Sequence, residues 1–463
     1  MNGGHQFDPA ILREYDIRGV AGETLHPADA YAVGRTFGTL LRRAGGHRAV
    51  VGRDGRLSSP MLEQALVEGL MATGADVVRI GLAATPMLYF AAATLSVDGG
   101  IQVTGSHNPR DHNGFKMVLG ARPFFGADIQ HLGAMAATGD WEAGSGRSKR
   151  VEVLDAYVDR LLLGLSNVAP DKLASLRIGW DAGNGAAGPA IERLTAKLPG
   201  EHHLLFTEVD GRFPHHHPDP TVETNLADLK ALVAREKLDF GVAFDGDADR
   251  IGALDGTGRV IWGDQLLTIF AQDLLRRQPG ASVIADVKAS RMLFDAVERF
   301  GGQPIMWKSG HSNIKAKMLE SGAALGGEMS GHIFFAEDWF GFDDGLCAAV
   351  RLMAASVRLD RSVTDMRGAM AEGFSTPELR FPVDPARKFV AVEEVKQRLT
   401  ADGIDFVAID GVRVTTEDGW WLLRASNTQD MLTARAESAT AEGLERLIGT
   451  IDAQLALSGL SRS

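Results

Sequence analysis

Three carboxylates stand at every second position of one short segment, as Asp245, Asp247 and Asp249, with apolar stretches before and after them. In an extended or looped segment, a spacing of two points all three side chains one way. Gly246 is expected to let the backbone turn tightly. Like charges held this close repel unless a cation lies among them, and oxygen ligands suit a hard ion such as Mg²⁺. The spacing predicts a magnesium site; an acidic surface turn is the alternative.

A serine lies at the tip of a second polar loop, Thr104–Pro109, which follows a predicted strand over residues 100–104. Ser106 could act as a nucleophile, but serine is inert unless another group activates it. His107 is a poor base for it, because neighbouring side chains on an extended segment point apart. Lys116 is close in sequence and is the candidate acid–base group. The alternative for this loop is a plain turn.

Polar side chains alternate in a third loop, at Glu328, Ser330 and His332. Alternation places them on one face if the segment is extended. A carboxylate, a hydroxyl and an imidazole together can recognise the vicinal hydroxyls of a sugar. A hairpin with exposed polar residues is the alternative interpretation.

A fourth loop follows a strand predicted over residues 420–424 and contains Arg424, Ser426, Asn427 and Thr428. A guanidinium with hydroxyls and an amide suits a phosphate dianion, which arginine can bind through two hydrogen bonds. A Ser/Asn-rich turn would have a similar composition. A metal, a serine, a hydroxyl reader and a phosphate binder in one chain together indicate phosphoryl transfer on a sugar phosphate.

Histidines occur at two further places of interest, position 311 and the run 215–217. His311 precedes a predicted helix over residues 314–320, and a lone histidine is more often structural than catalytic. The run 215–217 consists of three histidines, but consecutive side chains cannot converge on one ion without strain. The Pro-Asp-Pro that follows is typical of a stiff connector.

Strands and helices alternate along most of the chain, with Gly- or Asp-rich loops between them. Strands are predicted near residues 49–52, 76–80, 100–104, 176–180 and 282–287, and helices near 59–73, from 86, 188–198 and 290–300. This alternation predicts an α/β fold with parallel or mixed sheets, whose binding residues lie at the carboxyl ends of the strands.

The pattern starts afresh near residues 150, 257 and 370, and residues 136–150 are expected to form a connection. We therefore expect α/β domains at 1–150 with the serine loop, 151–256 with the metal loop and 257–369 with the sugar loop. A smaller α+β domain at 370–463 would hold the phosphate loop, with strands at 406–409, 412–415 and 420–424 and a closing helix at 440–457.

Composition excludes some classes of protein. The chain has 463 residues, of which 45% are hydrophobic, so it can bury sizeable cores. A net charge of −12 argues against general nucleic-acid binding. Cys347 is the only cysteine, which excludes an intramolecular disulfide. We expect a cytoplasmic protein, because the first residues do not resemble a signal peptide, and we expect no membrane span.

The motifs occur in the order typical of one family. They are Tyr15–Gly19, Thr104–Pro109, Asp245–Arg250, Gly327–His332 and Arg424–Thr428. On these residues the chain resembles the α-D-phosphohexomutase family, and most closely its bacterial phosphomannomutase/phosphoglucomutase branch. The resemblance implies three related mixed-sheet α/β domains and a smaller C-terminal α+β domain around one central cleft.

The resemblance also implies residue roles. Ser106 would be carried as phosphoserine, and Asp245, Asp247 and Asp249 would bind Mg²⁺ together with a phosphoserine oxygen. The remaining matches fall into charge-stabilising or acid–base positions, at Arg18, Lys116, Arg250 and His311, and into substrate-binding positions, at Tyr15, Lys288, Glu328, Ser330, His332, Arg424, Ser426, Asn427 and Thr428. Two departures are Asp430, where the family often has proline, and Ala248, where many members have glycine.

The implied activity interconverts hexose 1-phosphate and hexose 6-phosphate of mannose or glucose. It would pass through a hexose 1,6-bisphosphate, in a monomer or weak dimer whose partners are small hexose phosphates. Phosphoglucosamine mutase is a rival within the family, although Met329 stands where that branch more often has glutamine. A metal-dependent sugar phosphatase and a non-catalytic sugar-phosphate sensor are the rivals from other classes.

Overall fold

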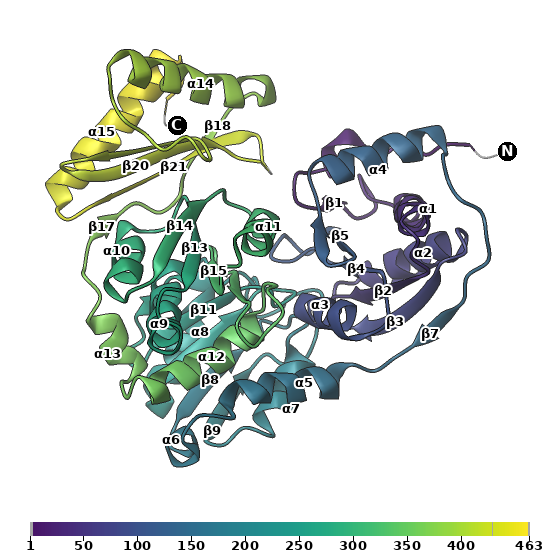
Figure 1. Cartoon of the computed structure of the whole chain (residues 1–463), viewed down its shortest axis with the longest axis horizontal. Coiled ribbons are helices and arrows are strands. Elements are labelled where there is room, and N and C mark those ends of the chain that lie inside the picture. The colour runs from purple at the N-terminus through teal and green to yellow at the C-terminus, as the bar shows by residue number, and fades with distance from the viewer. Residues whose placement is uncertain (1–2, 428, 462–463) are drawn as a thin grey trace.

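Within residues 3–427 and 429–461, which the computed structural model describes, the strands form four sheets that follow one another along the chain (Figure 1). Each sheet and the helices that cover it are called a unit here, numbered from first to fourth in chain order. Figure 1 shows the first unit on one side, the second and third packed together, and the fourth above the third.

The first unit contains the serine loop. Its sheet has the order β1-β5-β4-β2-β3-β7, with β6 beside β5; β2, β3, β4 and β7 run parallel. The strands are β1 (Ile17–Val20), β2 (Arg48–Arg53), β3 (Asp76–Leu82), β4 (Gly99–Val103), β5 (His112–Leu119), β6 (Arg122–Phe124) and β7 (Ser148–Arg150). The helical segments are η1 (Pro9–Ile11), α1 (Pro27–Arg43), α2 (Ser59–Met71), α3 (Thr85–Thr94) and α4 (Ala127–Thr138).

The second unit contains the metal loop, in a mixed sheet of order β12-β11-β10-β8-β9. Its strands are β8 (Arg177–Asp181), β9 (Glu201–Leu205), β10 (Phe240–Phe244), β11 (Ile251–Asp255) and β12 (Val260–Ile261). Its helical segments are α5 (Leu154–Leu162), η2 (Leu163–Leu165), α6 (Pro170–Ala174), α7 (Gly188–Thr195), η3 (Glu223–Leu226) and α8 (Ala227–Glu236).

The third unit contains the sugar loop, in a mixed sheet of order β14-β13-β15-β16. Its strands are β13 (Ser282–Asp286), β14 (Gln303–Trp307), β15 (Leu325–Gly327) and β16 (Ile333–Phe335). Its helices are α9 (Gly263–Arg277), α10 (Arg291–Arg299), α11 (His311–Ser321), α12 (Gly345–Arg358) and α13 (Val363–Gly368).

The fourth unit contains the phosphate loop, on an antiparallel sheet of order β17-β21-β20-β19 with β18 beside β21. Its strands are β17 (Phe374–Ser375), β18 (Leu379–Pro382), β19 (Val412–Thr416), β20 (Gly419–Ala425) and β21 (Met431–Ser438). Helices α14 (Pro385–Ala401) and α15 (Ala441–Leu457) pack on it. The expectation of three α/β units followed by an α+β unit is confirmed.

Helix starts follow local sequence signals. Pro27 and Pro385 stand in the first turns of α1 and α14, where a missing N–H leaves no hydrogen bond unmade. The side chains of Asp344 and Thr440 accept hydrogen bonds from backbone N–H groups that would otherwise lack a partner at the starts of α12 and α15.

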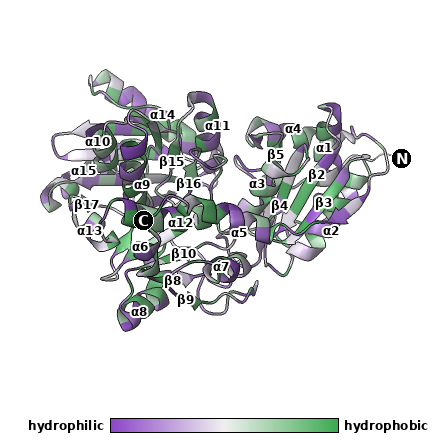
Figure 2. Ribbon diagram, turned by 60° about the horizontal axis from the view of Figure 1, so that its bottom comes forward, coloured by the Kyte–Doolittle hydropathy of each residue, from purple (hydrophilic) through white to green (hydrophobic). Residues whose placement is uncertain are grey.

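The second and third units share one hydrophobic core. It includes Trp180 and Phe244 of the second sheet and most of α12, including the buried Cys347. Figure 2 shows hydrophobic residues on α12 between these units and along β3 and β4 of the first sheet. Because α12 is apolar on nearly all sides, it must be enclosed by neighbouring elements, and this joins the two units.

Two expectations about local structure are wrong. Residues 406–409 do not form a strand; only an isolated bridge joins Val407 to Arg413, and residues 404, 406 and 407 are not buried in a sheet core. The predicted connection at 136–150 includes β7, whose three residues are all exposed. An exposed edge strand lacks the apolar alternation that makes a strand visible in sequence. The other predicted strands and helices are present, although α7 ends earlier than expected.

Across the described part of the chain, no helix has both the length and the apolar character needed to cross a bilayer.

Arg413 joins the fourth unit to the third. Its side chain is buried and donates from Nη1 to the carbonyls of Val287, at 2.6 Å, and Ala289, at 2.9 Å. The guanidinium carbon lies 3.7 Å from the ring centre of Trp420, which packs against Val287. Burial lowers the pKa of Arg413 to about 10, which leaves it charged at neutral pH.

We predict that Arg413→Ala lowers the free energy of unfolding by about 3 kcal/mol, because two buried carbonyls lose their donor and Trp420 loses a cation–π contact. Urea unfolding followed by tryptophan fluorescence measures the change. Arg380→Ala is the control, since the Arg380 side chain is 61% exposed. Equal stability of the two variants would contradict a joining role for Arg413.

Candidate active site

The three predicted metal-ligating carboxylates are fully buried in the turn between β10 and β11. Each of Asp245, Asp247 and Asp249 offers an oxygen within 4.8 Å of the others. The positive φ of this turn falls on Ala248, at 61°, and not on Gly246 as we expected. Gly246 serves close packing, because a Cβ there would lie 2.5 Å from the Ser106 carbonyl oxygen.

Ser106 and Lys116 of the first unit reach directly into this carboxylate cluster. The Ser106 hydroxyl donates to Asp245 Oδ2 at 2.8 Å, and its backbone has a φ of 49°. Lys116, on β5, donates from Nζ to Asp247 Oδ2 at 2.8 Å and also to Asp249. A positive φ is uncommon for a residue other than glycine, and here it places Ser106 at the tip of its turn.

Burial and charge act against each other in the cluster. Burial raises the pKa of Asp245, and the charges of Asp247 and Asp249 raise it further. Burial also raises the pKa of Asp249, but Lys116 and His332 outweigh it and hold the pKa well below its ordinary value. Burial lowers the pKa of Lys116, yet Asp247 and Asp249 raise it above its ordinary value. The carboxylates therefore depend on cations placed among them.

The carboxylate cluster fits a divalent cation. Among the described residues, Asp247 Oδ1 is a buried oxygen without a hydrogen-bond partner, and Asp249 Oδ1 has only His332 Nε2 near it, at 3.3 Å, while Oδ2 of each is bonded. Buried oxygens left without a donor are costly, and an all-oxygen set suits Mg²⁺. The residues present can therefore hold such an ion.

The polar side chains of the sugar loop do lie close together, but the backbone that places them is a turn and not the expected extended segment. Glu328, Ser330 and His332 lie in the turn between β15 and β16 and not on an extended face. Gly331, with a φ of 90°, turns the chain so that His332 Nδ1 lies 3.2 Å from Glu328 Oε2 and 3.0 Å from Ser330 Oγ. Burial lowers the pKa of His332, but the charge of Asp249 and the hydrogen bonds to Asp249 and Glu328 together raise it to about 9.

His311 begins α11 and stacks on His332, with ring centres 5.3 Å apart. Its Nδ1 lies 3.4 Å from Asp343 Oδ2, and Lys315 also contacts Asp343, at 2.8 Å. Burial lowers the pKa of His311 well below its ordinary value, and the charge of Lys315 lowers it further. The ring is therefore neutral.

The phosphate loop of the fourth unit lies where this unit meets the third and the first. Arg424, at the end of β20, donates from Nε to Asp410 Oδ2 at 3.0 Å, and Asp410 also accepts from the Ser309 N–H. Ser426 accepts from the Gln429 N–H. Asp430 is exposed and pairs with Lys388 at 3.4 Å, which offsets its charge. Thr428 lies outside the described residues.

Tyr15 connects three units. Its hydroxyl donates to the Ser309 carbonyl at 2.9 Å and accepts from Asn427 Nδ2 at 2.7 Å. The Tyr15 ring also lies 6.1 Å from that of His311. The remaining predicted residues are near by: Arg18 pairs with Asp16, Arg250 Nε lies 3.3 Å from His332 Nε2, and Lys288 Nζ lies 3.7 Å from both Asp286 and Glu378.

The chain is similar to known proteins over most of its length. Family models match in order: phosphoglucomutase/phosphomannomutase alpha/beta/alpha domain I at 9–141, domain II at 155–258, domain III at 262–373 and the C-terminal domain at 378–454. A phosphomannomutase/phosphoglucomutase of Pseudomonas putida is 44% identical over 447 residues, which cover 96% of this chain and 95% of that protein.

The chain belongs to the phosphoglucomutase/phosphomannomutase family.

Other relatives agree with this assignment. A phosphoglucomutase of Neisseria gonorrhoeae is 41% identical, over 94% of this chain and 95% of that protein. The crystal structure of a phosphoglucomutase/phosphomannomutase family protein from Burkholderia thailandensis superposes with a TM-score of 0.92 at 41% identity and covers 99% of both chains. The resemblance inferred from the sequence motifs is therefore confirmed.

In this family member, sequence reasoning missed Arg56. Its buried side chain donates to the carbonyls of Ser106 at 2.7 Å, Asn108 at 2.6 Å and His112 at 2.9 Å, and also to that of Pro109. The guanidinium thus holds the whole serine loop. The signal was available, because Arg56 lies in a loop at the carboxyl end of a strand, β2, where binding residues concentrate.

Residues of the second unit also hold the serine loop. Asp219 contacts His107 Nδ1 at 3.1 Å, and His217 Nε2 lies 2.6 Å from the His107 carbonyl oxygen. His216 instead contacts Asp181, at 3.0 Å, and His215 contacts Asn184. The three consecutive histidines therefore point to different partners, as the sequence argument against a shared ion predicted.

We predict that Arg56→Lys lowers kcat by about 10- to 100-fold with little change in KM, because an ammonium cannot reach all four carbonyls and Ser106 loses its exact position. Steady-state kinetics measures the effect, and urea unfolding confirms that the variant is folded. Arg110→Lys is the control, an exposed position of the same loop. A rise in KM with an unchanged kcat would contradict this role.

Proposed function

We propose that this protein is a phosphohexomutase that interconverts the 1-phosphate and 6-phosphate of mannose or glucose through a phosphoserine at Ser106 and a bisphosphorylated sugar. One observation carries the proposal. The Ser106 hydroxyl contacts Asp245 inside the buried carboxylate cluster, and the sugar and phosphate loops belong to the same network of contacts. Family relatives named phosphomannomutase/phosphoglucomutase support it.

In the proposed first half-reaction, a free hydroxyl of the hexose phosphate attacks the phosphorus on Ser106. The new O–P bond forms, the Oγ–P bond breaks, and the hydroxyl proton passes to a base. His311 matches an acid–base position of the family and stacks on His332 of the sugar loop, so it is the candidate base. Lys116, which contacts Asp247 in the same carboxylate cluster as Ser106, would give a proton to the serine oxygen released when the Oγ–P bond breaks. Arg18 and Arg250 would stabilise charge on the transferring group.

Asp245, Asp247 and Asp249, with an oxygen of the phosphorylated Ser106, would hold Mg²⁺, which when bound supplies Lewis-acid stabilisation of the phosphoryl oxygens.

The second half-reaction requires the sugar bisphosphate to present its other phosphate to Ser106. The phosphate loop must then accept either end of the molecule, which a guanidinium with hydroxyl and amide groups can do. We propose that Arg424, Ser426, Asn427 and Thr428 hold the phosphate that does not react, while Glu328, Ser330, His332, Lys288 and Tyr15 contact the sugar.

We further propose that residues 1–150, 151–256, 257–369 and 370–463 are the four domains. The matches to family models and the succession of sheets support boundaries near these positions. Tyr15 would hold the first, third and fourth domains together around the substrate. Such closure would exclude water and protect the phosphoserine from hydrolysis.

An assay with three substrates tests the function and its specificity. The purified protein is incubated with Mg²⁺, a trace of glucose 1,6-bisphosphate, and mannose, glucose or glucosamine 1-phosphate in turn. We expect the 6-phosphates of mannose and glucose to form quickly. A preference for glucosamine phosphate would assign the rival specificity, and release of free phosphate without an isomer would overturn the mutase proposal.

We predict that Ser106→Ala lowers mutase turnover by at least about a thousandfold, because no other described side chain occupies the nucleophile position. Mass spectrometry of the wild-type protein after incubation with glucose 1,6-bisphosphate should show a phosphoryl group on the Ser106 peptide. Near-normal turnover of the variant would contradict the phosphoserine relay.

We predict that Arg424→Ala raises KM for glucose 1-phosphate by about 10- to 100-fold, because a charged hydrogen bond to phosphate is lost. Arg446→Ala is the matched control, since Arg446 is an exposed arginine of the same unit that pairs with Asp418. A KM unchanged in Arg424→Ala would place the phosphate contact elsewhere.

A further inference from the structure

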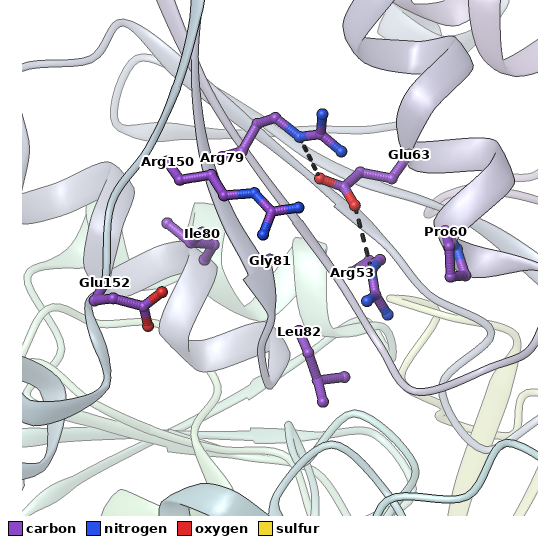
Figure 3. Close-up of a pocket in the computed structure, with 9 residues that line it drawn as sticks. All are labelled: Arg53, Pro60, Glu63, Arg79, Ile80, Gly81, Leu82, Arg150 and Glu152. Atoms are coloured by element: carbon purple, nitrogen blue, oxygen red, sulfur yellow. Dashed lines mark hydrogen bonds and ion pairs between the residues drawn. The ribbon is translucent and has the colours of Figure 1, made fainter.

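A second charged cavity lies in the first unit, away from the carboxylate cluster. It has a volume of about 340 Å³ and is lined by Arg53, Glu63, Arg79, Arg150 and Glu152, with Pro60, Ile80, Gly81 and Leu82. Figure 3 shows the guanidinium groups of Arg79 and Arg53 on two sides of the Glu63 carboxylate and that of Arg150 near by, while the Glu152 carboxylate lies to one side. A volume of this size is at the lower end of the range for small-molecule sites.

The charges in this cavity are only partly compensated. Glu63 is buried and bridges two arginines, with 3.2 Å to Arg53 Nε and 2.8 Å to Arg79 Nε. Within the part of the chain that the structure describes, no ion pair of Arg150 is found. Three guanidinium groups thus face two carboxylates. Arg53 Nη1 also donates to the Asp54 carbonyl at 3.2 Å and Arg79 Nη1 to Gln64 Oε1 at 3.0 Å, so Arg150 and the Nη2 atoms of the other two arginines are the groups left for an anion.

The position of the cavity in the fold is one where ligands bind. Strands β2, β3 and β7 are parallel and end at Arg53, Leu82 and Arg150, so their carboxyl ends form one edge of the sheet. The serine loop follows β4, which is parallel to β2, at the same edge. The first turn of α2, with Pro60, also lines the cavity.

We propose that this cavity is a second anion site that binds a phosphate dianion, either free or as the monoester of a small sugar. Guanidinium groups from three neighbouring strands suit the tetrahedral oxygens of phosphate. Arginine is the side chain best able to donate two parallel hydrogen bonds to a pair of these oxygens. The aliphatic surface is small, which disfavours an apolar ligand. The site does not depend on the proposed mutase reaction.

An anion bound in this cavity would affect the position of the proposed catalytic serine, Ser106. Arg53 precedes Asp54, whose Oδ2 accepts hydrogen bonds from Thr104 Oγ1 at 2.9 Å and the Gly105 N–H at 3.0 Å. Arg150 belongs to the segment that leads from the first sheet to α5 of the second unit. An anion that binds both arginines would restrain this segment against the serine-bearing sheet. We therefore expect occupancy of this cavity to lower kcat, separately from any rise in KM that phosphate causes by competing at the proposed phosphate loop.

Equilibrium dialysis of the full chain against labelled inorganic phosphate tests the binding. The Arg424→Ala background is used so that the proposed phosphate loop contributes little. We expect one phosphate per chain, a Kd at least about tenfold higher on adding Arg150→Ala, and a Kd a few-fold lower on adding Glu152→Gln. Lys149→Ala is the matched control, because Lys149 is an exposed cation of the same strand whose side chain points to the other face.

Equal binding by the Arg150→Ala and Lys149→Ala proteins, or no binding in the Arg424→Ala background, would overturn the proposal. Repeating the titration with glucose 6-phosphate distinguishes the two sources of the dianion by their dissociation constants. Phosphate inhibition of mutase activity adds a kinetic measurement: a fall in kcat should be present in wild type and lost in Arg150→Ala. Failure of the mutase assay itself would leave the dialysis result unaffected, so the two proposals fail separately.

Discussion

The burial of three carboxylates at the end of β10 is the constraint on which the rest of the structure depends. Asp245, Asp247 and Asp249 are fully buried, and an isolated buried carboxylate is very costly in free energy. Compensating cations come from other units: Lys116 from the first and His332 from the third. The cluster is therefore stable only when the units are assembled around it, so the carboxylate cluster also forms part of the junction between units.

Contacts between units continue outward from the carboxylate cluster. Glu328 binds His332 and also accepts from the Gly310 N–H at 2.7 Å, next to Ser309, whose carbonyl receives the Tyr15 hydroxyl. Asn427 of the fourth unit completes the chain of contacts at Tyr15. Residues that would hold a substrate thus already hold one another, and a ligand that replaces these contacts would alter how the units meet.

Much of the fold and site was predictable because the information was local. The Asp245–Asp249 spacing, the TGSHNP loop and the strand–loop–helix rhythm each occupy a contiguous stretch. Prediction failed where geometry depended on distant groups. Gly246 is needed for the close approach of Ser106, and the sugar loop converges through a turn at Gly331. The role of Arg56 rests on carbonyls 50 to 56 residues away, which no spacing reveals.

By itself, the sequence determined which chemical groups stand in each loop and that those loops follow strands, because side-chain type and short spacing set local direction. Only the tertiary structure decided which loops meet. Ser106 contacts Asp245 across 139 residues, and Tyr15 contacts Asn427 across 412. The cavity of Arg53, Arg79 and Arg150 likewise exists only because three parallel strands end side by side. Packing of the hydrophobic cores sets these long-range distances, and no local pattern encodes them.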